Sequence, residues 1–237
     1  MTERGMAQVA RDSASLAIGP SSLRWTGSAL EINVDEVCAP LPRRLRGSIR
    51  VMPAAICERT FALDDAGRHR WTPFAARARI NVDFAEPSLS WSGSAYIDGN
   101  AGDEPLENEF KHWTWARASS PERTVVQYDT LSRSGKSRTL GLQFTGSAEA
   151  ERIELPAQVP LPRTRWRIAR QTRNDAGHEA RVIKTLEDAP FYSRSLVRSR
   201  LMGSDGIAFH ESLSLDRFRS PWVQWMLPFR MPRIARR

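Results

Sequence analysis

Residues 76–84 alternate apolar and polar side chains along their whole length, in the order Ala-Arg-Ala-Arg-Ile-Asn-Val-Asp-Phe. Successive side chains of a β-strand point to opposite faces of a sheet. The alternation therefore predicts a strand with one buried face and one wet face, and it favours a fold built from sheets.

Strand-like segments recur along most of the chain. Glycine-containing turns at 134–136, 175–177 and 204–206 separate several of them. Many strands at short spacing with such turns are typical of an all-β barrel or sandwich. The other expected strands cover residues 29–35, 46–51, 89–98, 112–118, 123–132, 137–145, 165–173, 180–187 and 195–201.

An acidic stretch from Asp103 to Phe110 interrupts the strand pattern. The chain has 237 residues, which is enough for one large or two small domains. We place a domain boundary in this stretch and predict two all-β domains, residues 1–105 and 106–237.

The chain is strongly basic, with a net charge of +8 and a pI of about 10.4. Such a charge favours anionic partners, either nucleic acid or the headgroups of an acidic membrane. No nucleic-acid motif is present, so we expect no nucleic-acid partner. The four histidines are scattered and no glycine-rich phosphate loop or nucleophile elbow occurs, so we expect neither a metal nor a cofactor.

The last twenty residues, 218–237, interleave aromatic and apolar side chains with arginines. Aromatic rings beside arginines are typical of an interfacial membrane anchor. The alternative is that Trp222 and Trp225 pack on the fold and only the last arginines are solvated. No run of about 18 apolar residues occurs, so no membrane-spanning helix is expected.

Two short segments about thirty residues apart each pair an aromatic with an ionisable residue two positions away. His69 is paired with Trp71, and Tyr96 with Asp98. Residues i and i+2 of a strand share a face. Two such strands facing one cavity would surround a ligand with a carboxyl, an imidazole and two π faces. This set suits an acid that protonates an apolar substrate and then shelters the resulting cation.

Each of these residues also has a simpler interpretation. Asp98 precedes Gly99 and could cap a turn. His69 could be a surface histidine in a hairpin, and Trp71 and Tyr96 could be core aromatics. In the functional interpretation, Asp98 is a buried acid whose pKa is raised by desolvation, so that it keeps a proton near neutral pH.

The segment from Ser94 to Glu107 contains Tyr-x-Asp-x-Asn-x-Gly followed by Asp-Glu-Pro-Leu-Glu, and Trp-x-Trp-x-Arg follows at 113–117. Together these motifs resemble the carotenoid 1,2-hydratases, also called hydroxyneurosporene synthases. The closing segment 219–233 and the opening Met-Thr-Glu-Arg-Gly resemble the same family. The resemblance extends over essentially the whole chain.

This resemblance implies two consecutive lipocalin-like β-barrels. It also implies addition of water across the terminal 1,2 double bond of acyclic carotenoids, without a redox cofactor. The family's acid falls on Asp98 with Tyr96, and its His-x-Trp pair falls on His69 and Trp71. The expected partners are an acyclic carotenoid of the neurosporene or lycopene type, water and an anionic membrane surface. The expected location is cytoplasmic, at the periphery of the inner or photosynthetic membrane.

In the family, Met-Thr-Glu-Arg-Gly lies within the chain, after an N-terminal β segment, whereas here it begins at Met1. We therefore expect a truncated or short form whose first barrel is incomplete at its N-terminus, with an open edge. Two other functions remain open at this point. One is a non-catalytic lipocalin-like carrier of carotenoid or another isoprenoid, and the other is a related isomerase or cyclase.

Overall fold

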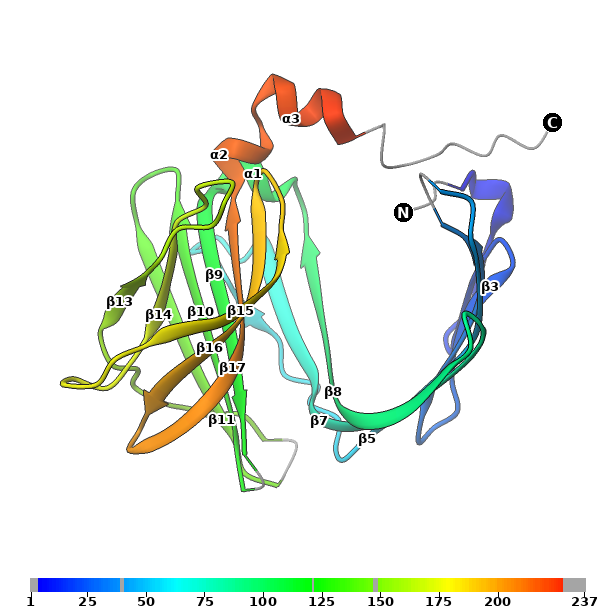
Figure 1. The fold of residues 1–237 in the computed structure, drawn as a ribbon, viewed down its shortest axis with the longest axis horizontal. Helices are drawn as coiled ribbons and strands as arrows, with labels where there is room; N and C mark the ends of the chain where they lie inside the picture. Colours follow the sequence, from blue (N-terminus) through cyan, green and yellow to red (C-terminus); the bar gives the residue numbers. More distant parts are fainter. Residues whose placement is uncertain (1–3, 39–40, 121, 147–148, 228–237) are drawn as a thin grey trace. The chain divides into compact units, whose positions relative to one another are not determined.

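The computed structural model describes residues 4–38, 41–120, 122–146 and 149–227. These residues form two large antiparallel sheets and one small hairpin, so the predicted all-β class is confirmed (Figure 1). The strands are β1 (Val9–Arg11), β2 (Ser15–Ile18), β3 (Ser21–Trp25), β4 (Leu30–Val37), β5 (Arg44–Pro53), β6 (Phe61–Ala62), β7 (His69–Glu86), β8 (Leu89–Gly102), β9 (Phe110–Ser119), β10 (Thr124–Ser132), β11 (Ser137–Phe144), β12 (Glu151–Arg152), β13 (Gln158–Leu161), β14 (Arg170–Arg173), β15 (Arg181–Asp188), β16 (Tyr192–Leu201) and β17 (Ser204–Ser214).

The first sheet contains β1 to β8 in the order β1-β2-β3-β4-β5-β7-β6, with β8 paired to β7. The alternating segment 76–84 lies inside β7. Ala76 and Val82 are buried there while Asn81 and Asp83 are exposed, which confirms the prediction from their alternation. Strand β7 begins at His69 rather than at residue 76, so the hairpin region expected around His69 is part of a strand.

The second sheet has the order β12-β11-β10-β9-β17-β16-β15, and β13 pairs with β14 separately. Figure 1 shows β9, β10, β16 and β17 in this sheet. The turn predicted at 204–206 lies two residues earlier in the structure. The chain reverses at Met202 and Gly203, whose φ angles are 52° and 78°, and Leu201 pairs with Ser204. Two successive residues with positive φ match the right-handed twist of a hairpin.

The end strands of each large sheet do not pair with one another within the described residues, so no closed barrel is present there. Two consecutive barrels therefore remain a prediction. A short helix, α1 (Leu106–Glu109), occupies the acidic stretch and separates the last strand of the first sheet from β9. Helices α2 (Leu215–Phe218) and α3 (Pro221–Met226) follow β17. No helix in the described ranges is both long and apolar enough to cross a bilayer.

The chain divides into two compact units. Unit 1 is the described part of Met1–Ile56, Arg77–Ile97 and Gln224–Arg237, and unit 2 is that of Cys57–Ala76 and Asp98–Val223. Strands β7 and β8 contribute to both units. The division into domains 1–105 and 106–237 stays a prediction.

One face of the second sheet is polar although it is buried. Ser193 on β16, Ser212 on β17 and Thr114 on β9 are direct register neighbours and are at most 4% exposed. His210 lies on this face, and its Nε2 is 2.8 Å from the carbonyl oxygen of Gln171 in β14. Burial lowers the pKa of His210 to about 4, so the imidazole is neutral in the folded protein at neutral pH.

We expect His210 to make folding stability depend on pH. Its pKa in the folded protein lies below its ordinary value of 6.5, so the unfolded chain binds a proton first as the pH falls. The contribution of His210 to the free energy of unfolding is therefore fully present above pH 6.5. It declines by about 3 kcal/mol as the pH falls to 4. The His210→Gln variant keeps a donor for the Gln171 carbonyl but does not titrate. The difference in the free energy of unfolding between wild type and this variant, measured by urea denaturation, should therefore decrease from pH 6.5 to pH 4.

The exposed His178 supplies the matched control, His178→Gln, which should show no such change with pH. A wild-type advantage over His210→Gln that stays constant from pH 6.5 to 4 would contradict the assignment.

Candidate active site

Strand β7 brings His69 and Trp71 to one buried face. His69 is 1% exposed and Trp71 is 0% exposed, while Arg70 and Thr72 between and after them are half-buried. The expectation that i and i+2 share a face is therefore confirmed for this pair. The alternative of a surface histidine is wrong, because β7 begins at His69 and turns its ring inward.

A tight turn before β7 positions His69. The carboxylate of Asp64 accepts hydrogen bonds from the backbone N–H of Arg68 at 3.0 Å and of His69 at 2.8 Å. The imidazole packs on the ring of Phe110 with 5.0 Å between ring centroids. Gly102 leaves space for it, because a Cβ at that position would lie 2.9 Å from His69 Nδ1.

Asp98 is joined to Trp71 by a direct hydrogen bond. The indole Nε1 of Trp71 donates to Asp98 Oδ2 at 2.8 Å, and this bond links β7 to β8 within unit 2. Asp98 is inside strand β8, which continues to Gly102, so the interpretation as a turn-capping aspartate is wrong. The expectation of a buried acid is also wrong, since Asp98 is exposed on its strand.

Tyr96 lies two residues before Asp98 on β8 and is half-buried. It belongs to unit 1, whereas the other three predicted residues belong to unit 2. Within unit 2 the structure brings Asp98 into contact with Trp71, and it places His69 on the same strand face as Trp71.

Sequence reasoning missed the side chains that surround Trp71. Its indole meets the ring of Tyr128 edge-on at 5.5 Å and lies 6.0 Å from the ring of Phe61. Tyr128 in turn contacts Trp113 at 5.6 Å. The sequence predicted the strand that contains Tyr128. It could not show which side chains contact Tyr128, because those side chains come from other strands. Only the pairing of distant strands assembles this aromatic cluster.

The Tyr128 phenol is 4% exposed. Its pKa is raised far above its ordinary value of 10, first by burial and then by the negative charges of Asp98 and Glu211. The phenol therefore stays protonated and can act as a neutral hydrogen-bond donor beside Asp98.

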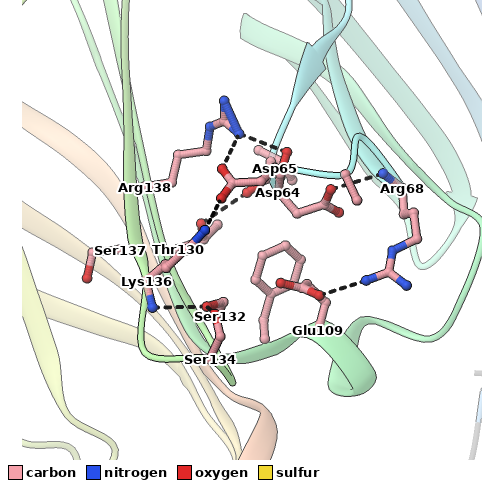
Figure 2. Close-up of a pocket in the computed structure, with 13 residues that line it drawn as sticks. Asp64, Asp65, Arg68, Glu109, Thr130, Ser132, Ser134, Lys136, Ser137 and Arg138 are labelled. Carbon is pink, nitrogen blue, oxygen red and sulfur yellow. Dashed lines mark hydrogen bonds and ion pairs between the residues drawn. The ribbon is translucent and has the colours of Figure 1, made fainter.

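A separate pocket of about 610 Å³ opens on unit 2 (Figure 2). Its charged side chains are already paired: Lys136 Nζ lies 2.9 Å from an Asp65 oxygen, and Arg68 lies 3.0 Å from Glu109. None of the four predicted site residues lines it. A pocket lined by these polar and charged side chains suits a polar occupant. Asp64, which also lines the pocket, belongs to the turn that positions His69. Over the described ranges, no group of three or more His, Cys, Asp or Glu residues is placed to hold a metal ion.

The Trp71–Asp98 hydrogen bond predicts energetic coupling between the two side chains. Trp71→Phe keeps an aromatic ring but removes the Nε1 donor, and Asp98→Ala removes the acceptor. In a double-mutant cycle by chemical denaturation we expect a coupling energy of about 1–2 kcal/mol. Additive single-mutant effects would show that the bond does not form in solution. The pair Trp71→Phe and Asp103→Ala serves as the matched control, since Asp103 pairs with Arg70 instead.

Comparison with known proteins identifies the family to which this chain belongs. A family model described as "Carotenoid hydratase CrtC" matches residues 1–237. A protein of Thiocapsa roseopersicina named acyclic carotenoid 1,2-hydratase is 53% identical over 99% of this chain, and one of Rubrivivax gelatinosus with the same name is 44% identical. The chain spans 58% of the length of each. A third, from Cereibacter sphaeroides, is 38% identical, and the chain covers 84% of it.

Solved structures share the fold at low identity. An AttH candidate from Nitrosomonas europaea aligns with a TM-score of 0.56 at 8% identity, over 89% of this chain and 72% of its own. CghA in complex with Sch210972 aligns with a TM-score of 0.51 at 14% identity, over 87% of this chain and 69% of its own. The full-length family match and the relatives at 38–53% identity confirm the resemblance seen in the sequence. The chain belongs to the CrtC family of carotenoid hydratases.

Proposed function

We propose that this protein adds water across the terminal 1,2 double bond of an acyclic carotenoid, giving the 1-hydroxy product. One observation carries the proposal: in a chain of this family, a carboxylate at the strand position of Asp98 is hydrogen-bonded to a buried indole. Three relatives are themselves named for this reaction. The substrate class is of the neurosporene or lycopene type.

Protonation is the difficult step, because an isolated alkene is a weak base. The carboxylic acid form of Asp98, which can still accept the indole N–H through its carbonyl oxygen, donates a proton to C2, and a tertiary cation forms at C1. Trp71 stabilises this cation through its π face, by about 1–2 kcal/mol for a desolvated contact. Tyr96, two residues before Asp98 on β8, is the second aromatic residue that the family resemblance implies. Water then adds to C1, and His69 orients it.

We further propose that the whole protein is built from two consecutive lipocalin-like barrels, the first carrying the site and the second beginning near residue 106. The change of sheet at α1 supports this division. An apolar barrel mouth suits a substrate whose long chain end must be withdrawn from water.

The acid is tested by pigment analysis in a cell that makes lycopene or neurosporene. Wild type should yield a more polar pigment that is heavier by one water. The Asp98→Asn variant should lower hydration by at least about 100-fold while the protein remains folded, because an amide cannot donate the proton. The matched control is Asp103→Asn, an exposed carboxylate on the same segment, which should retain activity.

The other outcomes distinguish the alternatives. Full activity of the Asp98→Asn variant would contradict the assignment of Asp98 as the acid. Bound pigment without a mass change would favour a carrier, and a new pigment of unchanged mass would favour an isomerase or cyclase.

We also propose peripheral contact with an anionic membrane, because the substrate dissolves in membranes. The C-terminal segment is the candidate for this contact. Trp222 stacks on Trp166 with 6.0 Å between centroids, which favours packing for that residue, while Trp225 is 70% exposed. The remaining aromatic and basic residues, 228–237, lie outside the described residues.

Deleting residues 228–237 should therefore weaken co-sedimentation with vesicles that contain anionic lipid. A matched variant with Arg230, Arg233, Arg236 and Arg237 changed to Gln keeps the aromatics. Each arginine contributes roughly 1 kcal/mol near an anionic surface, so this variant should also lose binding. Binding that is unchanged in both variants would count against the segment, and equal binding to neutral vesicles would count against electrostatic docking.

A further inference from the structure

A second carboxylate lies on the face of the second sheet that meets Trp71. Glu211 on β17 is the register partner of Trp115 on β9, and Trp115 is the register partner of Tyr128 on β10. Directly opposed residues of neighbouring strands project to the same face. Glu211, Trp115 and Tyr128 therefore form one row across three strands, and Tyr128 and Glu211 are two strand spacings apart, roughly 10 Å between Cα atoms.

The two carboxylates approach this row from different strands. Asp98 reaches it from β8 through Trp71, whose indole meets Tyr128 edge-on at 5.5 Å. Glu211 reaches it from β17. Both charges contribute to the raised pKa of Tyr128, which supports the proximity of each to the phenol. An apolar chain end that reaches the rings of Tyr128 and Trp115 would thus meet one carboxylate from β8 and another from β17.

Glu211 is held in place rather than free to rotate. Its Oε1 lies 2.9 Å from Nε of Arg194 on the neighbouring strand β16, and its side chain is 19% exposed. It also helps to raise the pKa of Tyr192, after the larger effect of burial. A fixed, partly accessible carboxylate can accept a proton from a water molecule beside it.

His69 is less suited to accept that proton. It is 1% exposed, and within the described residues neither ring nitrogen has a hydrogen-bond partner. The nearest carboxylate oxygen, on Glu104, is 3.8 Å from Nε2. An enclosed ring of this kind can orient a neighbour, but among the described residues it has no hydrogen-bonded partner to which it could pass a proton.

We propose that Glu211 is the general base that deprotonates the attacking water. The inference rests on the proposed hydration. Asp98 gives its proton to C2, forming a C–H bond at the expense of the double bond. The oxygen of water forms a bond to the C1 cation, and Glu211 accepts the proton that this oxygen releases. Asp98 ends as a carboxylate and Glu211 as a carboxylic acid, and exchange with solvent restores both.

Deuterium exchange distinguishes the role of Asp98 as the acid from that of Glu211 as the base. In D₂O, Asp98 delivers a deuteron to C2. If water does not capture the cation, it can lose a protium from C2 or from a methyl group on C1 to a neighbouring water molecule, and the alkene that forms keeps the deuterium. In purified Glu211→Gln we expect hydration to fall at least about 100-fold while deuterium appears in the recovered carotenoid. Asp98→Asn should show neither hydration nor exchange.

The matched control is Asp205→Asn. Asp205 also lies on β17 and also pairs with an arginine, at 2.9 Å from Arg200. This variant should hydrate as wild type does, and thermal melting of all variants checks that they fold. Hydration by Glu211→Gln within twofold of wild type would overturn the inference, as would loss of both hydration and exchange in a folded Glu211→Gln protein. Absence of any hydroxylated product from wild type would instead overturn the proposed function.

Discussion

The hydrogen bond from Trp71 to Asp98 is the interaction on which the candidate site depends. It joins two strands of unit 2 and holds an exposed carboxylate against a fully buried indole. The indole packs against Tyr128 and Phe61, so the hydrogen-bond donor to the carboxylate is held in a fixed position. Such support by neighbouring side chains is what keeps a reacting group within a fraction of an ångström of its working position.

The two faces of the second sheet serve different purposes. One carries the aromatic row of Tyr128 and Trp115, with Glu211 in the same row. The other carries buried serines and the neutral His210. Successive side chains alternate between the faces, so strands β9, β10 and β17 can present an apolar surface on one side and a hydrogen-bonding surface on the other.

The sequence predicted four residues at one site, and three of them, His69, Trp71 and Asp98, lie in unit 2, whereas Tyr96 lies in unit 1. The i, i+2 spacing was sufficient for His69 and Trp71, because strand geometry fixes which face a side chain takes. It did not reveal that Asp98 is exposed, since exposure depends on what neighbouring strands cover. It also gave no indication of Tyr128 or Glu211, which lie 30 and 113 residues beyond Asp98 and approach the site only through strand pairing.

The sequence alone determined the all-β class, most strand positions and the family, because alternation and short motifs are local properties of the chain. Tertiary structure alone decided the partners of Trp71, the exposure of Asp98 and the position of Glu211. Hydrogen bonds between strands join residues that are far apart in sequence, and register is set by the whole sheet. A residue's own neighbours in the chain therefore specify its strand and its face, while the side chains that surround it come from elsewhere.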